Sequence, residues 1–276
     1  MNQIDISQKT NSIKPILRWA GGKTWLIPSL REILINAKFQ NYHEPFVGGA
    51  SIFLSIQPPK AYLSDLNKEL IKTYKTVRND PEGIISALKA FKNTEAFYYK
   101  AREEKYESNA KKAAKFIYLN QTSFNGIYRV NLNGEYNVPY GFRKKKLLDQ
   151  ENFRVVSKLL QKATLISCDF DEIKTNIKRN DLIFLDPPYT VSHNLNGFIK
   201  YNQKIFSLED QHRLSRLIDY IKSKDAKYIL TNAAHDMVLE IFDKKDRVIT
   251  LSRNNLIGGL NAKRGITNEY LFTNFK

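Results

Sequence analysis

The sequence has a single cysteine, Cys168, four scattered histidines and no long apolar run. One cysteine cannot form an intramolecular disulfide. A membrane-spanning helix needs about 18 consecutive apolar residues, and none of the chain's apolar runs reaches that length. Residues 1–13 are polar, without the apolar core of a secretory signal. The histidines (His43, His193, His212 and His235) lack metal-ligand spacing, so we expect no metal site. The short apolar runs and the polar residues 1–13 lead us to expect a cytoplasmic protein without a membrane anchor.

Basic residues are abundant instead. The 276 residues contain 44 Lys and Arg against 28 Asp and Glu, so the formal charge is +16, and 42% of the chain is hydrophobic. That hydrophobic fraction supports a buried core, and the positive field attracts a polyanion. Nucleic acid is therefore the first partner to consider. A lysine-rich surface that merely reflects genomic composition is the alternative.

Strand and helix patterns alternate at both ends of the chain. Strand patterns are expected within 42–51, where the strand runs into a glycine turn and a short helix, within 60–67, where it ends on an acid, and at 163–168, 181–188, 227–232, 246–252 and 268–275. This alternation predicts an α/β, doubly wound, mostly parallel sheet ending in a hairpin. Helical patterns dominate residues 68–162 and predict an inserted, mainly helical subdomain between a core formed by 1–67 and 163–276. Residues 89–162 hold 16 Lys and Arg against 7 Asp and Glu, so we expect the polyanion at this insert.

The stretch LIFLDPPY, residues 182–189, carries the strongest chemical signal. Four apolar strand residues lead into Asp186, which the pattern places at the carboxyl end of a parallel sheet, where α/β proteins bind ligands. Pro187 and Pro188 stiffen the chain and direct carbonyl groups outward, and Tyr189 adds a flat ring. A carboxylate, a carbonyl and an aromatic face suit a planar amine. A Pro-Pro turn with a capping aspartate is the structural alternative.

Four blocks in order, RWAGGK (18–23), EPFVGGAS (44–51), FNGIYRVNLNGEYNVPYG (124–141) and DPPY (186–189), resemble the Dam-type DNA adenine-N6 methyltransferases. The resemblance extends from about residue 14 to the carboxyl end. It implies a class I methyltransferase fold, S-adenosylmethionine as cofactor and double-stranded DNA as partner, with residues 68–162 as the target-recognition subdomain. The implied reaction methylates N6 of a flipped adenine in a short GA-containing site, with GATC among the candidates. Asp186, Pro187 and Tyr189 would be catalytic.

The resemblance also fits a bacterial or phage-type setting, a monomer and a cognate restriction endonuclease. Three alternatives stay open: an RNA adenine-N6 methyltransferase, a cytosine-N4 methyltransferase, and a catalytically silent DNA-binding protein on the same fold. The first two would use the same pair of acceptors. The third predicts loss of acceptor or donor residues, whereas Asp186, Tyr189, Lys23 and Asp65 are all present.

The glycine-lysine turn at 21–23 is not a triphosphate loop, because Leu17 stands where such a loop needs its first glycine. The resemblance assigns Trp19 and Lys23 to the methionine end of the cofactor, Asp65 to its ribose, and Asp169 with Phe170 to its adenine. The purely structural alternatives are an exposed lysine, a solvent-facing Asp65, a core Phe170 and a helix-capping Asp171. The full cofactor set is Trp19, Ala20, Gly21, Gly22, Lys23, Pro45, Phe46, Gly48, Gly49, Ser51, Asp65, Asp169, Phe170 and Asp186.

The stretch 121–146 interleaves aromatic residues with Asn, Gly and Arg129 before a lysine run. Exposed aromatics and cations together are typical of a surface that stacks bases and holds phosphates. The resemblance places Ile127 and Arg129 where bases are read, and Phe124 and Asn125 near the gap left by the displaced base. A purely structural hairpin is the alternative. The full DNA set is Arg18, Phe124, Asn125, Gly126, Ile127, Arg129, Asn137, Pro139, Tyr140, Arg143, Lys144, Lys145 and Lys146.

Overall fold

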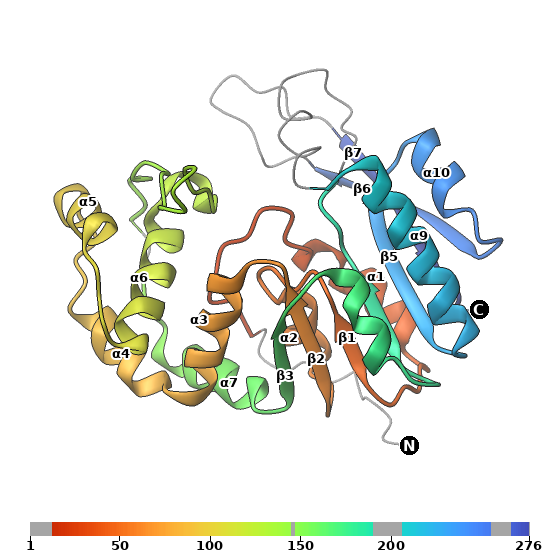
Figure 1. Ribbon diagram of the computed structural model, residues 1–276, viewed down its shortest axis with the longest axis horizontal. Coiled ribbons are helices and arrows are strands. Elements are labelled where there is room, and N and C mark those ends of the chain that lie inside the picture. The colour runs from red at the N-terminus through yellow and green to blue at the C-terminus, as the bar shows by residue number, and fades with distance from the viewer. Residues whose placement is uncertain (1–12, 145–146, 190–205, 255–265, 276) are drawn as a thin grey trace. The chain divides into compact units, whose positions relative to one another are not determined.

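The computed structural model describes residues 13–144, 147–189, 206–254 and 266–275 (Figure 1). The strands are β1 (Tyr42–Glu44), β2 (Ala61–Asp65), β3 (Ala163–Ser167), β4 (Leu182–Leu185), β5 (Lys227–Ala233), β6 (Arg247–Asn254) and β7 (Ile266–Thr273). The α-helices are α1 (Ile27–Leu34), α2 (Ser51–Ile56), α3 (Lys68–Asn79), α4 (Pro81–Lys89), α5 (Glu95–Glu103), α6 (Asn109–Thr122), α7 (Gln150–Leu160), α9 (Leu208–Ser223) and α10 (Asp236–Phe242). Short 3₁₀ helices are η1 (Thr24–Leu26), η2 (Phe124–Gly126) and η3 (Phe170–Asn176).

The seven-stranded sheet has the order β3-β2-β1-β4-β5-β7-β6. The pairs β2–β3, β1–β4 and β4–β5 are parallel, whereas β7 pairs antiparallel with both β5 and β6. The predicted mostly parallel sheet with a terminal hairpin is therefore confirmed. Since parallel strands all end at one edge, the residues that follow β4 and β5 lie on the same side of the molecule's sheet.

The chain forms two compact units. One comprises Glu32–Phe46 and Cys168–Lys276, and the other comprises Val47–Ser167 with the described residues up to Arg31. The first therefore holds β1 and β4 to β7, and the second holds β2, β3 and the helices α3 to α7. The sequence predicted a different division, into a catalytic core and a recognition subdomain at 68–162. Because that division separates functions and not compact units, it stays a prediction.

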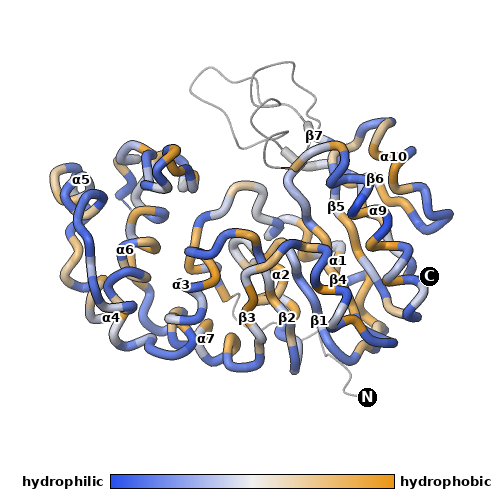
Figure 2. Tube along the Cα trace, in the orientation of Figure 1, coloured by the Kyte–Doolittle hydropathy of each residue, from blue (hydrophilic) through white to orange (hydrophobic). Residues whose placement is uncertain are grey.

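The core of the first unit is built from residues of η3, β4, β5, β7, α9 and α10. Helix α9 alternates between hydrophobic and polar residues along its length (Figure 2), and its buried face carries Leu214, Leu217, Ile218 and Ile221. Burying one such side chain stabilises the fold by about 1.5–3 kcal/mol. The helix begins at a capping box in which the Ser207 hydroxyl accepts the Asp210 N–H and the Asp210 carboxylate accepts the Ser207 N–H. Strand β5 is buried almost throughout.

The helices of the second unit begin where side chains can accept free N–H groups. Helices α3, α4, α5, α6 and α7 are each preceded by a capping side chain, respectively Asn67, Asp80, Thr94, Ser108 and Asp149. Replacing such a cap by alanine costs about 1 kcal/mol, so these residues fix the helix starts. The helical patterns predicted for this stretch are confirmed. Within the described residues, no helix is both long enough and apolar enough to cross a membrane.

Candidate active site

Asp186 follows the last residue of β4, at the carboxyl edge of the sheet. Its side chain is partly exposed, and its Oδ1 accepts a hydrogen bond from the Thr231 hydroxyl at 2.8 Å. Pro187 is buried, whereas Pro188 and Tyr189 are partly exposed. The Tyr189 hydroxyl donates to Oε2 of the buried Glu269 at 2.5 Å. The structure thus ties both polar groups of the predicted catalytic loop to residues that no sequence motif had indicated.

The surroundings of Tyr189 keep its hydroxyl protonated. Burial raises the pKa of Tyr189 well above its usual value, and the negative charges of Asp186 and Glu269 raise it further. A phenol in this setting acts as a hydrogen-bond donor at neutral pH, and not as a base. Asp186 and Glu269 are therefore held as acceptors next to neutral hydroxyl groups.

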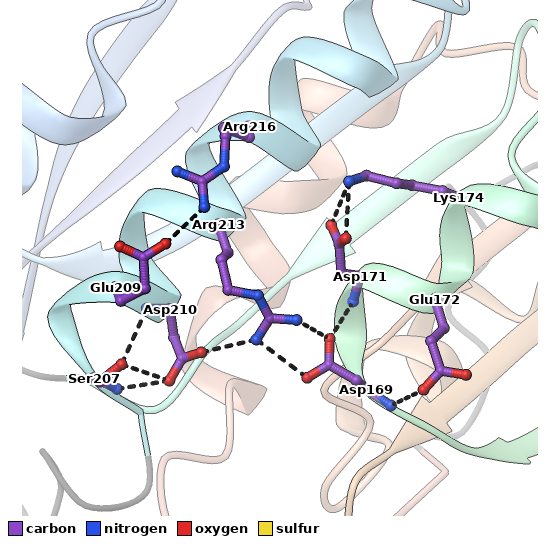
Figure 3. A network of polar contacts seen from close by, with 9 residues as sticks. All are labelled: Asp169, Asp171, Glu172, Lys174, Ser207, Glu209, Asp210, Arg213 and Arg216. Carbon is purple, nitrogen blue, oxygen red and sulfur yellow. Dashed lines mark hydrogen bonds and ion pairs between the residues drawn. The ribbon is translucent and has the colours of Figure 1, made fainter.

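A second polar cluster in the first unit surrounds Asp169 (Figure 3). Both carboxylate oxygens of Asp169 accept from the Arg213 guanidinium, at 2.5 and 3.3 Å, and Arg213 also donates to Asp210 at 2.8 Å. Asp169 caps η3 in a capping box with Glu172. The alternative that Asp171 caps this helix is therefore wrong, because Asp171 pairs with Lys174 instead.

The rings beside this cluster belong to the core. Phe170 is 6% exposed and packs against Phe46 and Phe206, with ring centroids 5.4 and 5.5 Å apart. The Arg213 guanidinium lies 4.7 Å from the Phe170 centroid, which is a cation–π distance. Pro45 is buried and Phe46 is partly exposed. The structure therefore brings Phe46, Asp169 and Phe170 together, and Arg213 links the last two.

In the second unit the indole of Trp19 covers the glycine turn at Gly48 and Gly49. A Cβ atom at Gly48 would lie 2.6 Å from Cδ1 of Trp19, and the φ angle of Gly48 is +43°. Only glycine allows this approach, because a side chain would meet both a clash and a strained backbone. The Trp19 ring also stacks on Tyr128, with ring centroids 5.6 Å apart and planes at 20°. Trp19 thus joins two motifs that are distant in sequence.

Residues 20–23 form a tight turn in front of η1. The Gly22 N–H donates to the Trp19 carbonyl at 3.1 Å, and Ala20, Gly21 and Gly22 are exposed. The Lys23 side chain is 3% exposed, and its ammonium donates to the Gly21 carbonyl at 2.9 Å. The alternative of an exposed lysine is therefore wrong. The Lys23 N–H also donates to the Ser51 hydroxyl at 3.3 Å, so this turn is fastened to α2.

Asp65 ends β2 and fastens the neighbouring glycine turn. Its two carboxylate oxygens accept the backbone N–H groups of Gly48 at 3.1 Å and Asn67 at 2.9 Å. Burial raises the pKa of Asp65, and these two backbone hydrogen bonds oppose that rise. Asp65 is partly exposed, but its carboxylate is bonded to two backbone N–H groups, unlike the free solvent-facing acid of the structural alternative. Because a carboxylate offers about four acceptor positions, these two bonds leave it able to accept more.

The segment 123–143 is a small hairpin held by side chains. Isolated bridges pair Ser123 with Tyr140 and Val130 with Tyr136. The Tyr136 hydroxyl donates to the Ile127 carbonyl at 2.6 Å, and the Phe124 N–H donates to the Pro139 carbonyl at 2.9 Å. The exposed guanidinium of Arg129 donates to the side chain and the backbone carbonyl of Asn137, at 2.8 and 3.1 Å.

The predicted DNA-binding residues differ in exposure to solvent. Phe124 is 51% exposed and Ile127 38% exposed, and Asn125 and Lys144 are exposed as well. Tyr140 is not exposed as expected: it is 8% exposed, and its hydroxyl donates to Asn93. Arg143 is partly exposed and donates to Gln121 at 3.0 Å. Lys145 and Lys146 lie outside the described residues.

Arg18 is joined to the hairpin through Asn120, a buried residue of α6. A Cβ atom at the buried Gly126 would lie 2.5 Å from Cβ of Arg18, so the Arg18 side chain packs directly on the Gly126 backbone. The Arg18 guanidinium lies 3.4 Å from the Ser123 carbonyl, and burial, followed by the charge of Arg143, lowers the pKa of Arg18. The sequence blocks at 18–23 and 124–141 are therefore one structural feature.

Four residues at these sites were missed by the sequence reasoning: Asn120, Arg213, Thr231 and Glu269. Glu269 offered a signal, since a lone acid stands in the apolar strand pattern NEYLFTNF. Thr231, Asn120 and Arg213 offered none, because strands and helices commonly carry such residues on solvent-facing positions. Their roles depend on which strand or helix lies beside them.

The strand order with its antiparallel β7, together with an Asp-Pro-Pro-Tyr loop after β4, defines a class I methyltransferase. The family model of the D12 class N6 adenine-specific DNA methyltransferases matches residues 19–255. Because this match covers most of the chain, the protein belongs to that family.

Individual relatives agree with this assignment. The chain is 34% identical to the type II methyltransferase M.MjaIII of Methanocaldococcus jannaschii, over 80% of this chain and 84% of the relative. It is 30% identical to the type II methyltransferase M1.LlaDCHI of Lactococcus lactis subsp. cremoris, over 96% of each chain. It is also 30% identical to the DNA adenine methylase of Haemophilus influenzae, over 83% of each. The chain is an adenine-specific DNA methyltransferase, and such enzymes imply S-adenosylmethionine as methyl donor.

Proposed function

We propose that this methyltransferase acts on an adenine rotated out of duplex DNA, within a short GA-containing site for which GATC is the first candidate. The observation that carries the proposal is the pair of anchored groups after β4. Asp186 accepts from Thr231 at 2.8 Å and Tyr189 donates to Glu269, so the loop presents a fixed carboxylate and a fixed ring.

Asp186 is assigned the role of an acceptor for the target amine, together with the Pro187 carbonyl. The lone pair of an adenine amine is delocalised into the ring. Acceptors that hold its two N–H groups favour a more tetrahedral and more nucleophilic nitrogen in the transition state. The Thr231 hydroxyl supports this role, since its hydrogen bond holds the Asp186 carboxylate in place.

The ring of Tyr189 is assigned the role of a platform for the extruded base. Rotating a base out of the duplex costs a few kcal/mol. Stacking on an aromatic ring returns about 1–3 kcal/mol, which offsets much of that cost. Since the Tyr189 hydroxyl is bonded to Glu269, the ring is positioned before the base arrives.

The second unit fits the cofactor. Asp65 follows a glycine turn at the end of β2 and has the acceptor capacity for the two hydroxyls of a ribose. Lys23 and the exposed backbone of Gly21 and Gly22 suit a carboxylate group. Asp169 and Phe170 in the first unit are assigned to the adenine moiety. When bound, S-adenosylmethionine would supply the methyl group from its sulfonium, leaving a thioether, and the methylated amine would release one proton to solvent.

The hairpin at 123–143 is assigned to target recognition. Arg129 is exposed and oriented by Asn137, and arginine that contacts guanine in the major groove is the commonest base-specific contact. Phe124 and Ile127 present apolar surface from the same segment. This combination of cation and apolar side chains supports a site in which guanine adjoins the target adenine.

Setting and partners extend this proposal. Two relatives are type II methyltransferases, which supports a cognate restriction endonuclease in the same system. We also assign a monomeric, cytoplasmic enzyme that needs no metal. Light scattering of the enzyme alone and with duplex DNA tests the monomer, and retained activity in the presence of a chelator tests the absence of a metal requirement.

The decisive experiment combines sequencing with one substitution. DNA from cells expressing the wild-type chain is sequenced for methylated adenines, and a single GA-containing motif is expected. Asp186→Ala should leave DNA affinity nearly unchanged while lowering kcat by a hundredfold or more, the order expected for losing a transition-state contact. Asp219→Ala, which removes a surface ion pair with Lys244, is the matched control. Activity of Asp186→Ala within tenfold of wild type would refute the role of Asp186.

A further inference from the structure

We propose that Thr231 and Glu269 are positioning residues of the catalytic loop: Thr231 orients the Asp186 carboxylate, and Glu269 orients the Tyr189 ring. This inference rests on the proposed function of that loop. Neither residue belongs to the Asp-Pro-Pro-Tyr motif. Thr231 lies on β5 and Glu269 on β7, the two strands that follow β4 in the order of the sheet.

Strand register places these residues on one face of the sheet. Leu185 of β4 lies opposite Leu230 of β5, so the next residues along, Asp186 and Thr231, are neighbours. Glu269 of β7 lies opposite Ala233 of β5. Because side chains alternate along a strand, Thr231 and Ala233 share a face, and Glu269 shares it with them. The antiparallel direction of β7 brings the beginning of that strand to the edge where β4 and β5 end.

Burial indicates that Glu269 has a specific task. Its side chain is 1% exposed, and an acid in such a position destabilises the fold unless hydrogen bonds satisfy it. The Tyr189 hydroxyl donates to it at 2.5 Å. An apolar residue would fill a core strand at lower cost. A ring needs no hydroxyl partner in order to stack, so the effect of this bond is to fix the direction of Tyr189.

Thr231 lies next to both groups of the loop. Its hydroxyl is 2.8 Å from Oδ1 of Asp186, and the residue is 1% exposed. The same hydroxyl also lies beside that of Tyr189. A hydroxyl has one hydrogen, and that of Thr231 is donated to Oδ1 of Asp186, so Thr231 selects one orientation of that carboxyl group.

The test uses substitutions that keep shape and remove the polar group. Thr231→Val and Glu269→Leu should each lower kcat by about tenfold to a hundredfold, the usual effect of removing a residue that hydrogen-bonds to a functional side chain. Their dissociation constants for S-adenosylmethionine and for duplex DNA should stay within twofold of wild type. Thr231→Ser keeps the hydroxyl and should restore most of the activity. Asn268→Ala, at an exposed position next to Glu269 on β7, is the matched control.

A double-mutant cycle separates positioning from simple structural support. Tyr189→Phe keeps the ring and removes the hydroxyl, so it should lower kcat as much as Glu269→Leu does. If Glu269 acts through that hydroxyl, adding Glu269→Leu to Tyr189→Phe has little further effect. Multiplicative losses, or kcat values of the Thr231→Val and Glu269→Leu variants within twofold of wild type, would overturn the inference. Should Glu269→Leu not fold, Tyr189→Phe tests the same bond from its other end.

A fluorescent base analogue, 2-aminopurine, at the target position gives a second readout. Wild type and the Thr231 variants should give the same fluorescence change on binding, whereas the Glu269→Leu and Tyr189→Phe variants should share an altered one. The proposed function is checked separately through Asp186→Ala. If that variant stays active, both ideas fail. If it is inactive while Thr231→Val and Glu269→Leu are fully active, only the present inference fails.

Discussion

The side-chain amide of Asn120 bonds both backbone polar groups of Arg18. Its Oδ1 accepts the Arg18 N–H at 2.7 Å, and its Nδ2 donates to the Arg18 carbonyl at 2.6 Å. The same Nδ2 reaches the Gly126 carbonyl at 3.2 Å. Through this one fully buried side chain, helix α6 holds two segments in place. One is the segment before the glycine-lysine turn, and the other is the turn that begins the hairpin.

Asn120→Ala should destabilise the protein by about 1–3 kcal/mol, because it leaves buried backbone groups without partners. The measurement is the free energy of unfolding from urea denaturation. Asn109→Ala, at an exposed position at the start of the same helix, is the control and should change little. Equal losses from both variants would show that helix content, and not the Asn120 hydrogen bonds, determines the effect.

Local signals predicted most of the fold. Alternating strands, capping residues and the terminal hairpin follow from patterns within a few residues, and the sheet and the helices between 68 and 160 appear where those patterns placed them. The position of Asp186 after β4 was predictable for the same reason, since the strand LIFL directly precedes it.

Tertiary partners were not predictable. Tyr140 is an aromatic in a polar segment, which suggested exposure, yet its hydroxyl reaches Asn93 and its ring packs against Tyr98. Asp169 carried a predicted contact to the cofactor, but nothing local indicated Arg213, 44 residues later, as its partner. Such pairings depend on which elements pack together, and periodicity along one strand or helix carries no information about that.

Gly48 is expected to tolerate no side chain. Gly48→Ala combines a positive φ angle with a Cβ atom 2.6 Å from Trp19, so Trp19 must leave the turn. We expect a loss of stability greater than the roughly 1–2 kcal/mol that backbone strain alone costs. Binding of S-adenosylmethionine in calorimetric titration should be at least tenfold weaker, a difference of about 1.4 kcal/mol.

Gly134 provides the control for Gly48. Its φ angle is +78°, but a Cβ atom there meets nothing within 4 Å. Gly134→Ala therefore carries the backbone strain alone, about 1–2 kcal/mol, and should leave cofactor binding unchanged. If both alanine variants lost stability equally, contact with Trp19 would not be the reason for glycine at position 48.

Asp181 should make stability fall in acid. Burial alone would raise its pKa, but hydrogen bonds from His43, the Lys178 N–H and Asn41 outweigh burial and hold the pKa of Asp181 below its usual value. An acid with a lowered pKa in the folded state stabilises it above the unfolded value of about 3.9, and that contribution is lost as the pH falls below it.

Asp181→Asn should lower the free energy of unfolding at pH 7 by about 1–3 kcal/mol, because the amide cannot accept at both positions. The variant should also show a flatter pH dependence than wild type below pH 4. The measurement is urea denaturation at a series of pH values. Asp225→Asn, which alters only a surface ion pair with Arg179, is the control and should keep the slope of wild type. A slope shared by all three proteins would assign the acid sensitivity to other groups.

Arg213 is expected to act on cofactor binding more than on stability. It donates to both oxygens of Asp169 (Figure 3). It also lies over the Phe170 ring, so it fixes the two residues assigned to the adenine moiety. Arg213→Ala should raise the KM for S-adenosylmethionine about tenfold, a loss of about 1.4 kcal/mol, with kcat nearly unchanged. Arg213→Lys should recover only part of this loss, because an ammonium cannot bond both oxygens of a carboxylate side by side.

Arg216→Ala, one turn further along α9, removes an exposed ion pair with Glu209 and should leave the KM unchanged. A wild-type KM in Arg213→Ala would mean that Asp169 keeps its orientation through the capping box alone, and a fall in kcat without a change in KM would move the adenine site away from Phe170.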